Sequence, residues 1–180
     1  ANYATSVLNS ISGKKAIFDK MKELIDRRSA SISNLEITDN NVYYYVKRMP
    51  GEEIGKVYRR NGYEGEEELF LDPATYKKEL EKIYTISSIT PNKDGDKIAI
   101  GISPNGSENP ETIIFRSNGE QFSETLKSAR GISWHKSGDE FFYNKLNSED
   151  VTDMNRKMFT KVFVHKIGNE QTLDIEFFSA

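Results

Sequence analysis

One segment of the sequence occurs twice, and its two copies align without a gap. Residues 89–100 read Ile-Thr-Pro-Asn-Lys-Asp-Gly-Asp-Lys-Ile-Ala-Ile, and residues 132–143 read Ile-Ser-Trp-His-Lys-Ser-Gly-Asp-Glu-Phe-Phe-Tyr. A weaker copy occupies residues 35–44, with Asn40-Asn41 at its centre. Each copy places short apolar runs on both sides of residues that tolerate a positive φ, which predicts a β-hairpin. A chain that repeats one hairpin in this way is expected to fold as an array of similar units.

A second hairpin is predicted after each copy. Apolar runs flank Asn61-Gly62, Asn118-Gly119 and Gly168-Asn169, and Asn-Gly between such runs is a strong hairpin signal. The predicted strand pairs are 56–60 with 67–71, 112–116 with 123–126, and 161–165 with 173–175. Each unit therefore contains two hairpins, which together supply four antiparallel strands.

Four strands repeated at a spacing of about 43–55 residues are typical of propeller blades. The sequence thus predicts an all-β partial β-propeller of about three four-stranded antiparallel blades, at residues 34–82, 83–128 and 129–180. The alternative is a plain antiparallel sandwich or meander, which also has strands at regular spacing. Trp134 is followed by His135 rather than aspartate, so the WD40 signature is absent.

Three blades do not close a ring, because typical propellers have about four to eight. Repeat units bury their apolar faces against neighbouring units, so the outer faces of the first and last predicted blades would lie open. We expect the chain to be a fragment of a longer protein, or these faces to bind a partner, with self-association as one outcome. The chain begins with Ala1 rather than Met, which fits a processed form or an excised piece.

Residues 1–33 are predicted as an N-terminal helical segment, with helix over residues 2–28. Apolar side chains recur there at spacings of three and four, which is the pattern of an amphipathic helix. They are Tyr3, Val7, Leu8 and Ile11, followed by Ile17, Phe18, Met21, Leu24 and Ile25. Ser12-Gly13 predicts a break between two short helices. So narrow a stripe needs a surface to cover it, and we expect the segment to dock on a larger body.

Charge and composition exclude several classes of function. The 180 residues contain 25 basic and 28 acidic side chains, for a net charge of −3, whereas a nucleic acid or an anionic membrane would favour a basic excess. No apolar run approaches the roughly 20 residues that span a bilayer. The absence of cysteine excludes a disulfide framework, a thiol nucleophile and a Cys-based zinc site. It fits both the cytosol and export, so the compartment stays open.

The motifs of hydrolytic chemistry are missing from the chain. There is no Gly-x-Ser-x-Gly elbow, and the two histidines are 30 residues apart in sequence, with His135 before a predicted turn and His165 inside a predicted strand. Both are expected to be surface or strand histidines rather than catalytic bases. The carboxylate runs Glu52-Glu53 and 66–68 are expected to be solvated faces. We therefore expect no catalytic residue, no metal and no cofactor in this chain.

The sequence from about residue 41 to residue 178 resembles the N-terminal part of the prolyl oligopeptidase family. The residues that carry the resemblance are Val42–Tyr45, Glu64–Glu66, Phe70–Pro73, Asp94–Lys97, Ser103–Glu108, Ser133-Trp134, Gly138–Asn144 and Val162–Gly168. Members of the family are serine peptidases whose hydrolase domain is capped by a seven-bladed propeller. Residues 2–28 are similar to the segment that leads from the hydrolase lobe into the propeller.

The resemblance implies that the Ser, Asp and His triad lies in an α/β-hydrolase domain beyond residue 180, so this chain alone would be inactive. Its partners would be that hydrolase domain and short proline-containing peptides, which the complete enzyme would cleave after proline. The family places an acidic residue at the position of Glu108, near the domain interface; the alternative for Glu108 is an exposed loop glutamate. Just before the third blade, where the family presents an aromatic residue to the substrate pocket, this chain has Ser128–Gly131.

A second function stays open at this point. The chain could be a stand-alone propeller-like module that binds peptide or glycan and never had a hydrolase domain. A hydrolase that uses paired carboxylates is disfavoured, because no such pair is evident. The reading frame beyond Ala180 separates the first two possibilities, since only a peptidase requires a downstream Gly-x-Ser-x-Gly followed by Asp and His.

Overall fold

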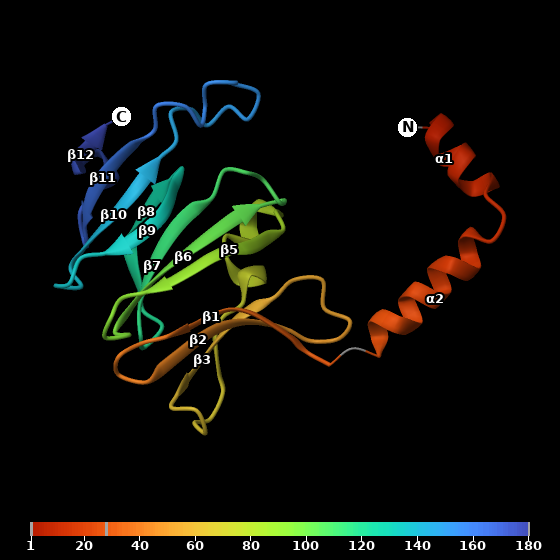
Figure 1. Cartoon of the computed structure of the whole chain (residues 1–180), viewed down its shortest axis with the longest axis horizontal. Coiled ribbons are helices and arrows are strands. Elements are labelled where there is room, and N and C mark those ends of the chain that lie inside the picture. Colours follow the sequence, from red (N-terminus) through yellow and green to blue (C-terminus); the bar gives the residue numbers. More distant parts are fainter. Residues whose placement is uncertain (1, 28, 180) are drawn as a thin grey trace.

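The structure is a computed structural model that describes residues 2–27 and 29–179. These residues form two N-terminal helices followed by three four-stranded antiparallel sheets (Figure 1). The first sheet consists of β1 (Ser31–Ile37), β2 (Val42–Arg48), β3 (Lys56–Asn61) and β4 (Glu68–Leu71), the second of β5 (Tyr84–Pro91), β6 (Lys97–Pro104), β7 (Glu111–Arg116) and β8 (Gln121–Lys127), and the third of β9 (Ala129–Trp134), β10 (Glu140–Lys145), β11 (Lys161–Lys166) and β12 (Ile175–Ser179). The predicted all-β array of four-stranded units is confirmed.

Strand order follows sequence order in every sheet. Hydrogen-bonded neighbours run β1-β2-β3-β4, β5-β6-β7-β8 and β9-β10-β11-β12, so each repeat forms a sheet of its own. This order contradicts the alternative of a two-sheet sandwich that shares strands from all repeats. Two strands were predicted to begin too early. Glu67 precedes β4. Leu173 and Asp174 precede β12, because residues 171–173 form a 3-10 turn in which the Asp174 N–H bonds the carbonyl of Gln171.

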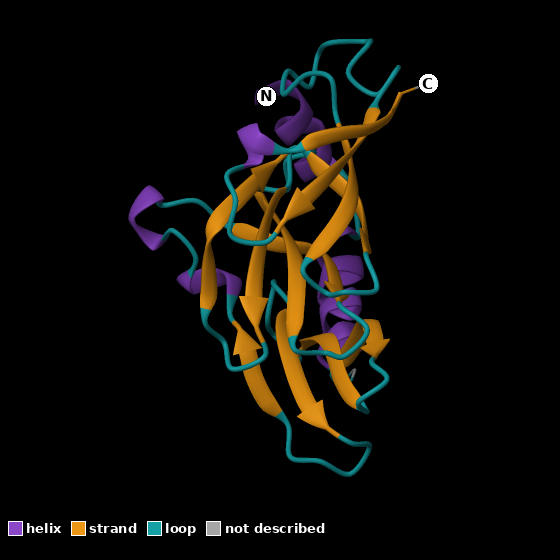
Figure 2. Ribbon diagram, turned by 90° about the vertical axis from the view of Figure 1, so that its left-hand side faces the viewer, coloured by secondary structure: helices purple, strands orange, loops and turns teal. Residues whose placement is uncertain are grey.

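The three sheets stack, and the second is the middle layer. Successive side chains of a strand point to opposite faces, yet all the residues from Ile98 to Ser103 in β6 are buried, so both faces of this strand are covered. One face packs against the first sheet through Val42, Tyr44, Val46 and Val57. Ile114 and Leu126 face the third sheet and pack with Phe141 and Tyr143. Figure 2 shows the strands as the body of the molecule.

The repeated turn adds a second contact between one sheet and the next, beside the apolar core. Gly95 adopts φ +76°, and a Cβ built on it would lie 2.7 Å from Thr38 Oγ1 in the first sheet. Gly138 adopts φ +72° at the corresponding place, where a Cβ would lie 2.8 Å from Asn92 Nδ2 in the second sheet. The backbone therefore approaches the preceding sheet where only glycine fits. The same element thus makes the turn and the stacking contact.

Both outer faces of the stack expose apolar side chains, and the face of the first sheet also carries polar groups. The outward face of the first sheet carries the stacked rings of Tyr45 and Tyr58 and the ion pair of Lys47 with Glu67 at 2.5 Å. The outward face of the third sheet is apolar. The ring centroids of Phe142 and Phe177 are 4.9 Å apart, and nearby side chains are exposed. Among the exposed side chains are Ile175 at 72%, Phe177 at 66% and Phe178 at 62%. On the outward face of the first sheet, Ile32, Ile37 and Leu69 are exposed as well, so both ends of the stack present apolar surface.

The N-terminal segment forms two helices, α1 (Asn2–Ser10) and α2 (Lys14–Asp26), separated at Ser12-Gly13 as predicted. Arg28, the last residue of the predicted helical stretch, lies outside the described residues. The apolar stripe of α2 is not covered, since Phe18 is 64% exposed and Met21 is 56% exposed. The expected docking on a larger body is therefore not made with the sheets of this chain, and the helices stand apart from them in Figure 1. Neither helix has the length and apolar character of a membrane span, as judged for the described residues.

Candidate functional site

The two histidines lie in different environments, and neither is arranged as a catalytic base. His135 is at the turn after β9, and its Nδ1 is 3.0 Å from Ser137 Oγ. His165 lies in β11 as predicted but is fully buried, with its Nδ1 2.8 Å from Asp174 Oδ1. A serine peptidase needs one histidine between a serine and a carboxylate. Within the described residues, the serine contact and the aspartate contact belong to different histidines.

Buried polar groups around His165 join the second and third sheets. Glu124 of β8 accepts a hydrogen bond from the Gly168 N–H at 2.8 Å, and its carboxylate is 3.9 Å from His165 Nε2. Asp174 also accepts from the Tyr143 hydroxyl at 2.7 Å, and burial raises the pKa of this tyrosine well above its ordinary range, helped by the Asp174 contact. Nowhere in residues 2–27 and 29–179 do three His, Asp or Glu side chains gather as metal ligands do. This cluster is therefore a structural connection.

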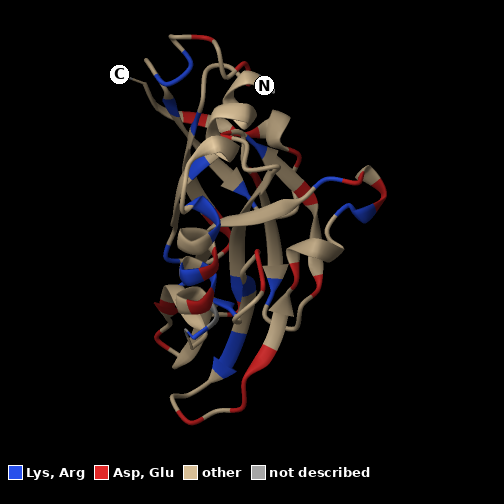
Figure 3. Cartoon of the chain, turned by 90° about the vertical axis from the view of Figure 1, so that its right-hand side faces the viewer, with Lys and Arg blue, Asp and Glu red and all other residues tan. Residues whose placement is uncertain are grey.

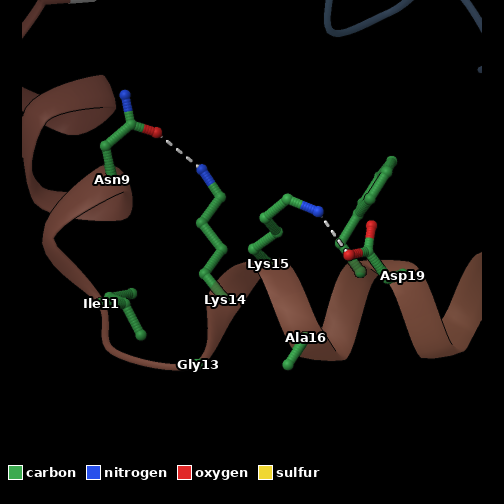
Figure 4. Close-up of a pocket in the computed structure, with 8 residues that line it drawn as sticks. Asn9, Ile11, Gly13, Lys14, Lys15, Ala16 and Asp19 are labelled. Carbon is green, nitrogen blue, oxygen red and sulfur yellow. Dashed lines mark hydrogen bonds and ion pairs between the residues drawn. The ribbon is translucent and has the colours of Figure 1, made fainter.

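The elbow between the helices is hollowed but carries no catalytic grouping. Its cavity, of about 790 Å³, is lined by residues of both helices and their link. In the close-up, Lys14 bonds Asn9 at 2.8 Å and Lys15 bonds Asp19 at 2.6 Å, so both ammonium groups are already paired (Figure 4). Figure 3 shows basic and acidic residues interspersed along the helices and the strands. Among the described residues that line the elbow, charge of one sign is not concentrated.

The predicted site residue Glu108 lies in the loop between β6 and β7. Its side chain is 61% exposed, and its carboxylate binds Lys157 at 3.0 Å and Arg156 at 3.2 Å. The hydrogen bond and the charge of Lys157 come first among the causes that hold the pKa of Glu108 below its usual range. The carboxylate is therefore ionised, and it stands at the end of the second and third sheets. Its predicted role near a domain interface stays a prediction.

Arg156 organises this loop, and no sequence pattern predicted its role. The side chain is only 3% exposed, and its guanidinium donates to the Glu108 carbonyl at 2.8 Å and to the Ser148 carbonyl at 3.2 Å. It also bonds the side chain of Asn109. The loop from β10 to β11 is thereby fastened to the loop from β6 to β7, so two repeats share one cluster.

A cavity of about 310 Å³ lies beside this cluster, between β5 and β9. Ala129, Arg130 and Gly131, from the segment where the sequence departs from the family pattern, form one of its walls. Ser87 and Ser88 of β5 also line the cavity. This cavity brings Arg130 near the Glu108 loop, because the Arg130 guanidinium donates to the Glu108 carbonyl. Sequence patterns could not show this proximity, since the residues belong to different repeats.

Comparison with known proteins gives one consistent family. The family model described as prolyl oligopeptidase, N-terminal beta-propeller domain, matches residues 1–180. A prolyl endopeptidase of Elizabethkingia meningoseptica is 32% identical over 138 residues, which cover 73% of this chain and 19% of that protein. A second, from Elizabethkingia miricola, is 31% identical over the same length. The chain therefore spans about a fifth of the curated relatives that it matches.

Solved structures show the same fold. A structure from an analysis of two prolyl endopeptidases superimposes with a TM-score of 0.83 at 23% identity, over 97% of this chain and 26% of the other. Prolyl oligopeptidase B from Galerina marginata, bound to a 25-residue macrocyclization substrate, gives a TM-score of 0.79 at 17% identity, over 100% of this chain and 28% of the other. The three stacked sheets and the helices are thus an arrangement found in larger proteins.

Proposed function

Because the chain belongs to the prolyl oligopeptidase family, through the N-terminal β-propeller domain of that family, we propose that it is the propeller portion of a serine endopeptidase that cleaves short peptides after proline. The match of the family model over residues 1–180 is the observation that carries this proposal. The chain itself is non-catalytic in this account. Its lack of a serine–histidine–carboxylate arrangement among the described residues supports that assignment.

The contribution of the propeller is to restrict which molecules reach the catalytic centre. The first strand of each repeat lies at an edge of its sheet, and β1 contacts β5. These edges are the inner strands of a ring, and a ring of sheets leaves a central channel. Such a channel passes an extended peptide and excludes a folded protein. Cleavage then follows by acyl transfer on the hydrolase domain.

Two surfaces of the chain support contact with an α/β-hydrolase domain. The stripe on α2 is apolar and exposed, and burying one such side chain stabilises a contact by about 1.5–3 kcal/mol. The ionised Glu108 projects from the end of the second and third sheets with 61% of its side chain accessible. An apolar contact from the helices and a polar contact from this loop would hold the two domains together.

The test compares the complete protein with this chain alone on a chromogenic peptide that ends in Gly-Pro before the scissile bond. We expect the complete protein to hydrolyse it and residues 1–180 to release no product. Hydrolysis by the 180-residue chain would contradict its non-catalytic role. Binding of peptide or glycan by a complete protein that hydrolyses neither would favour the stand-alone binding module instead.

We further propose that the isolated chain self-associates through the outward face of the third sheet. This face exposes Ile175, Phe177 and Phe178 at 72%, 66% and 62%, each more than the apolar side chains exposed on the outward face of the first sheet. Exposed apolar patches of this kind tend to be covered by another surface. Sedimentation should show a concentration-dependent dimer that Phe177→Lys converts to monomer. A monomer at high concentration for the unmodified chain would contradict this proposal.

A further inference from the structure

Half of the residues that line the cavity between β5 and β9 carry small hydroxyl side chains, and one is a cation. Ser87, Ser88, Ser103 and Ser107 contribute hydroxyl groups, and Arg130 also lines the cavity. Serine hydroxyls can donate hydrogen bonds, and a guanidinium carries donors only. A wall of donors without a carboxylate is suited to an anionic acceptor. The cavity volume of about 310 Å³ is enough for a side chain but small for a drug-sized ligand.

A β-bulge places both Ser87 and Ser88 at this cavity. Ile86 pairs with Ile102 and Ser88 pairs with Gly101, so Ser87 is the extra residue of the bulge. Such a bulge re-aims side chains that would otherwise alternate between the faces of a strand. Both hydroxyl oxygens consequently crowd Gly101, where an added Cβ would lie 2.5 Å from Ser88 Oγ and 2.6 Å from Ser87 Oγ. Glycine leaves room for the two hydroxyls.

A second bulge shapes the facing strand. Arg130 pairs with Asn144 and Ser133 pairs with Phe142, so two residues of β9 oppose the single residue between them on β10. Gly131 within this bulge has φ +63°, a conformation that side chains disfavour. The bulges of two different repeats thus meet at one cavity. Bulges often lie beside functional sites, where they direct particular side chains.

The charge of Arg130 is not balanced by a carboxylate. Arg130 and Arg156 both donate to the carbonyl oxygen of Glu108, which brings two guanidinium groups to one acceptor. The Glu108 carboxylate binds Arg156 and Lys157. Arg130 has no ion pair among the described residues, and its buried Nε has no hydrogen-bond partner there. Two guanidinium groups thus share one neutral carbonyl while the Glu108 carboxylate is paired with Arg156 and Lys157, and an anion beside Arg130 would offset its unpaired charge.

We propose that this cavity is a subsite for the side-chain carboxylate of an acidic residue in the peptide substrate. The inference rests on the proposed peptidase function, because β5 and β9 are then inner strands that face the peptide. Arg130 supplies the charge, and the serine hydroxyls donate to the remaining carboxylate oxygens. Guanidinium–carboxylate bonds are charge-assisted and directional, which favours an acidic side chain over its amide. The subsite would therefore set a sequence preference at one substrate position.

The test uses the complete protein and pairs of proline-containing peptides that carry Glu or Gln at one position. Both termini of each peptide are blocked, and the Glu or Gln residue is placed in turn at each position that flanks the proline. We expect kcat/KM at one position to favour Glu over Gln about 10-fold, which corresponds to about 1.4 kcal/mol. Arg130→Gln should abolish the Glu/Gln ratio. Arg116→Gln removes an equal charge at the far end of β7 and should keep the ratio.

The possible outcomes separate this inference from the proposed function. A Glu/Gln ratio of one at every position, or a ratio that Arg130→Gln leaves intact, would overturn the subsite. An equal gain from a free C-terminus on the Gln peptide would assign the cavity to the terminal carboxylate and overturn the side-chain assignment. Should the protein hydrolyse neither peptide, the proposed function fails, and calorimetric titration decides the subsite. Tighter binding of the Glu peptide supports it, and equal binding overturns it.

Discussion

Replacing Gly95 with alanine should weaken the contact between the first and second sheets beyond the effect of turn conformation alone. Gly95 has φ +76°, and the left-handed region costs a non-glycine residue about 1–2 kcal/mol. The new methyl group would also lie 2.7 Å from Thr38 Oγ1, 3.0 Å from its Cγ2 and 3.2 Å from its Cβ. Forced repacking of this kind costs about 1–3 kcal/mol. The free energy of unfolding should fall by about 2–5 kcal/mol in total.

Gly119→Ala is the matched control. Gly119 also has positive φ, at +88°, but an added Cβ would have no neighbour within 4 Å. Its cost is therefore the conformational part alone, about 1–2 kcal/mol. Thr38→Ala removes both atoms that crowd the methyl group most closely, so it should relieve the Gly95→Ala defect in the double mutant. Urea denaturation of the 180-residue chain, followed by circular dichroism, gives all four values.

Equal losses for Gly95→Ala and Gly119→Ala would refute the reasoning, because the close approach to Thr38 would then contribute nothing. Additive effects of Gly95→Ala and Thr38→Ala would refute it as well, since residues in contact should couple. A change in how steeply the free energy of unfolding falls with urea concentration would show instead that the native or the unfolded state had changed its compactness.

Three further predictions concern other parts of the chain. Arg156→Met should lower the free energy of unfolding by about 2–3 kcal/mol and should speed amide hydrogen exchange in the Glu108 loop. Unchanged exchange would contradict the role of Arg156 in holding the two loops together. Burial, and then the hydrogen bond to Glu67, raises the pKa of Tyr45 to about 12 from its ordinary 10.0. The neutral Tyr45 therefore stabilises the folded chain below pH 10, and this contribution to the free energy of unfolding is lost as the pH rises to 12. Glu67→Gln should lower the pKa of Tyr45 in an ultraviolet titration, and an unchanged titration curve would count against the contact. Phe18→Ser should change the free energy of unfolding of this chain by less than about 0.5 kcal/mol, because the side chain is exposed. In the complete protein it should weaken the contact between domains and lower the thermal midpoint. A larger loss of stability in this chain would mean that α2 packs on the chain's own sheets.

The parts of the fold that follow from local chemistry were predictable. Asp94-Gly95 and Ser137-Gly138 mark turns because glycine tolerates positive φ, and the apolar runs around them fix the neighbouring strands. The break at Ser12-Gly13 follows from the same chemistry, since Gly13 adopts φ +83°. These signals lie within a few residues of the structure they specify, so one sequence is enough to find them.

The parts that depend on contacts between repeats were not predictable. Arg156 lies in a loop with no periodicity, and its partner Glu108 belongs to the preceding repeat. His165 was placed in a strand, but its burial depends on the sheet that covers it. The bulge at Ser87 leaves no pattern in the sequence, because an extra serine in a strand reads like any other. The candidate site is formed by residues of different repeats, so it exists only in the stacked sheets.

The most direct test of the account is a pair of distances that show whether the sheets fan out from a common axis. The chain has no cysteine, so spin labels can be placed at single engineered cysteines without removing native ones. One pair joins the first strands at Glu36 and Ser133, and the other joins the last strands at Glu68 and Glu176, all of which are exposed. Blades around an axis predict a shorter distance for the first pair than for the second. Equal distances, or a longer first distance, would contradict the propeller arrangement.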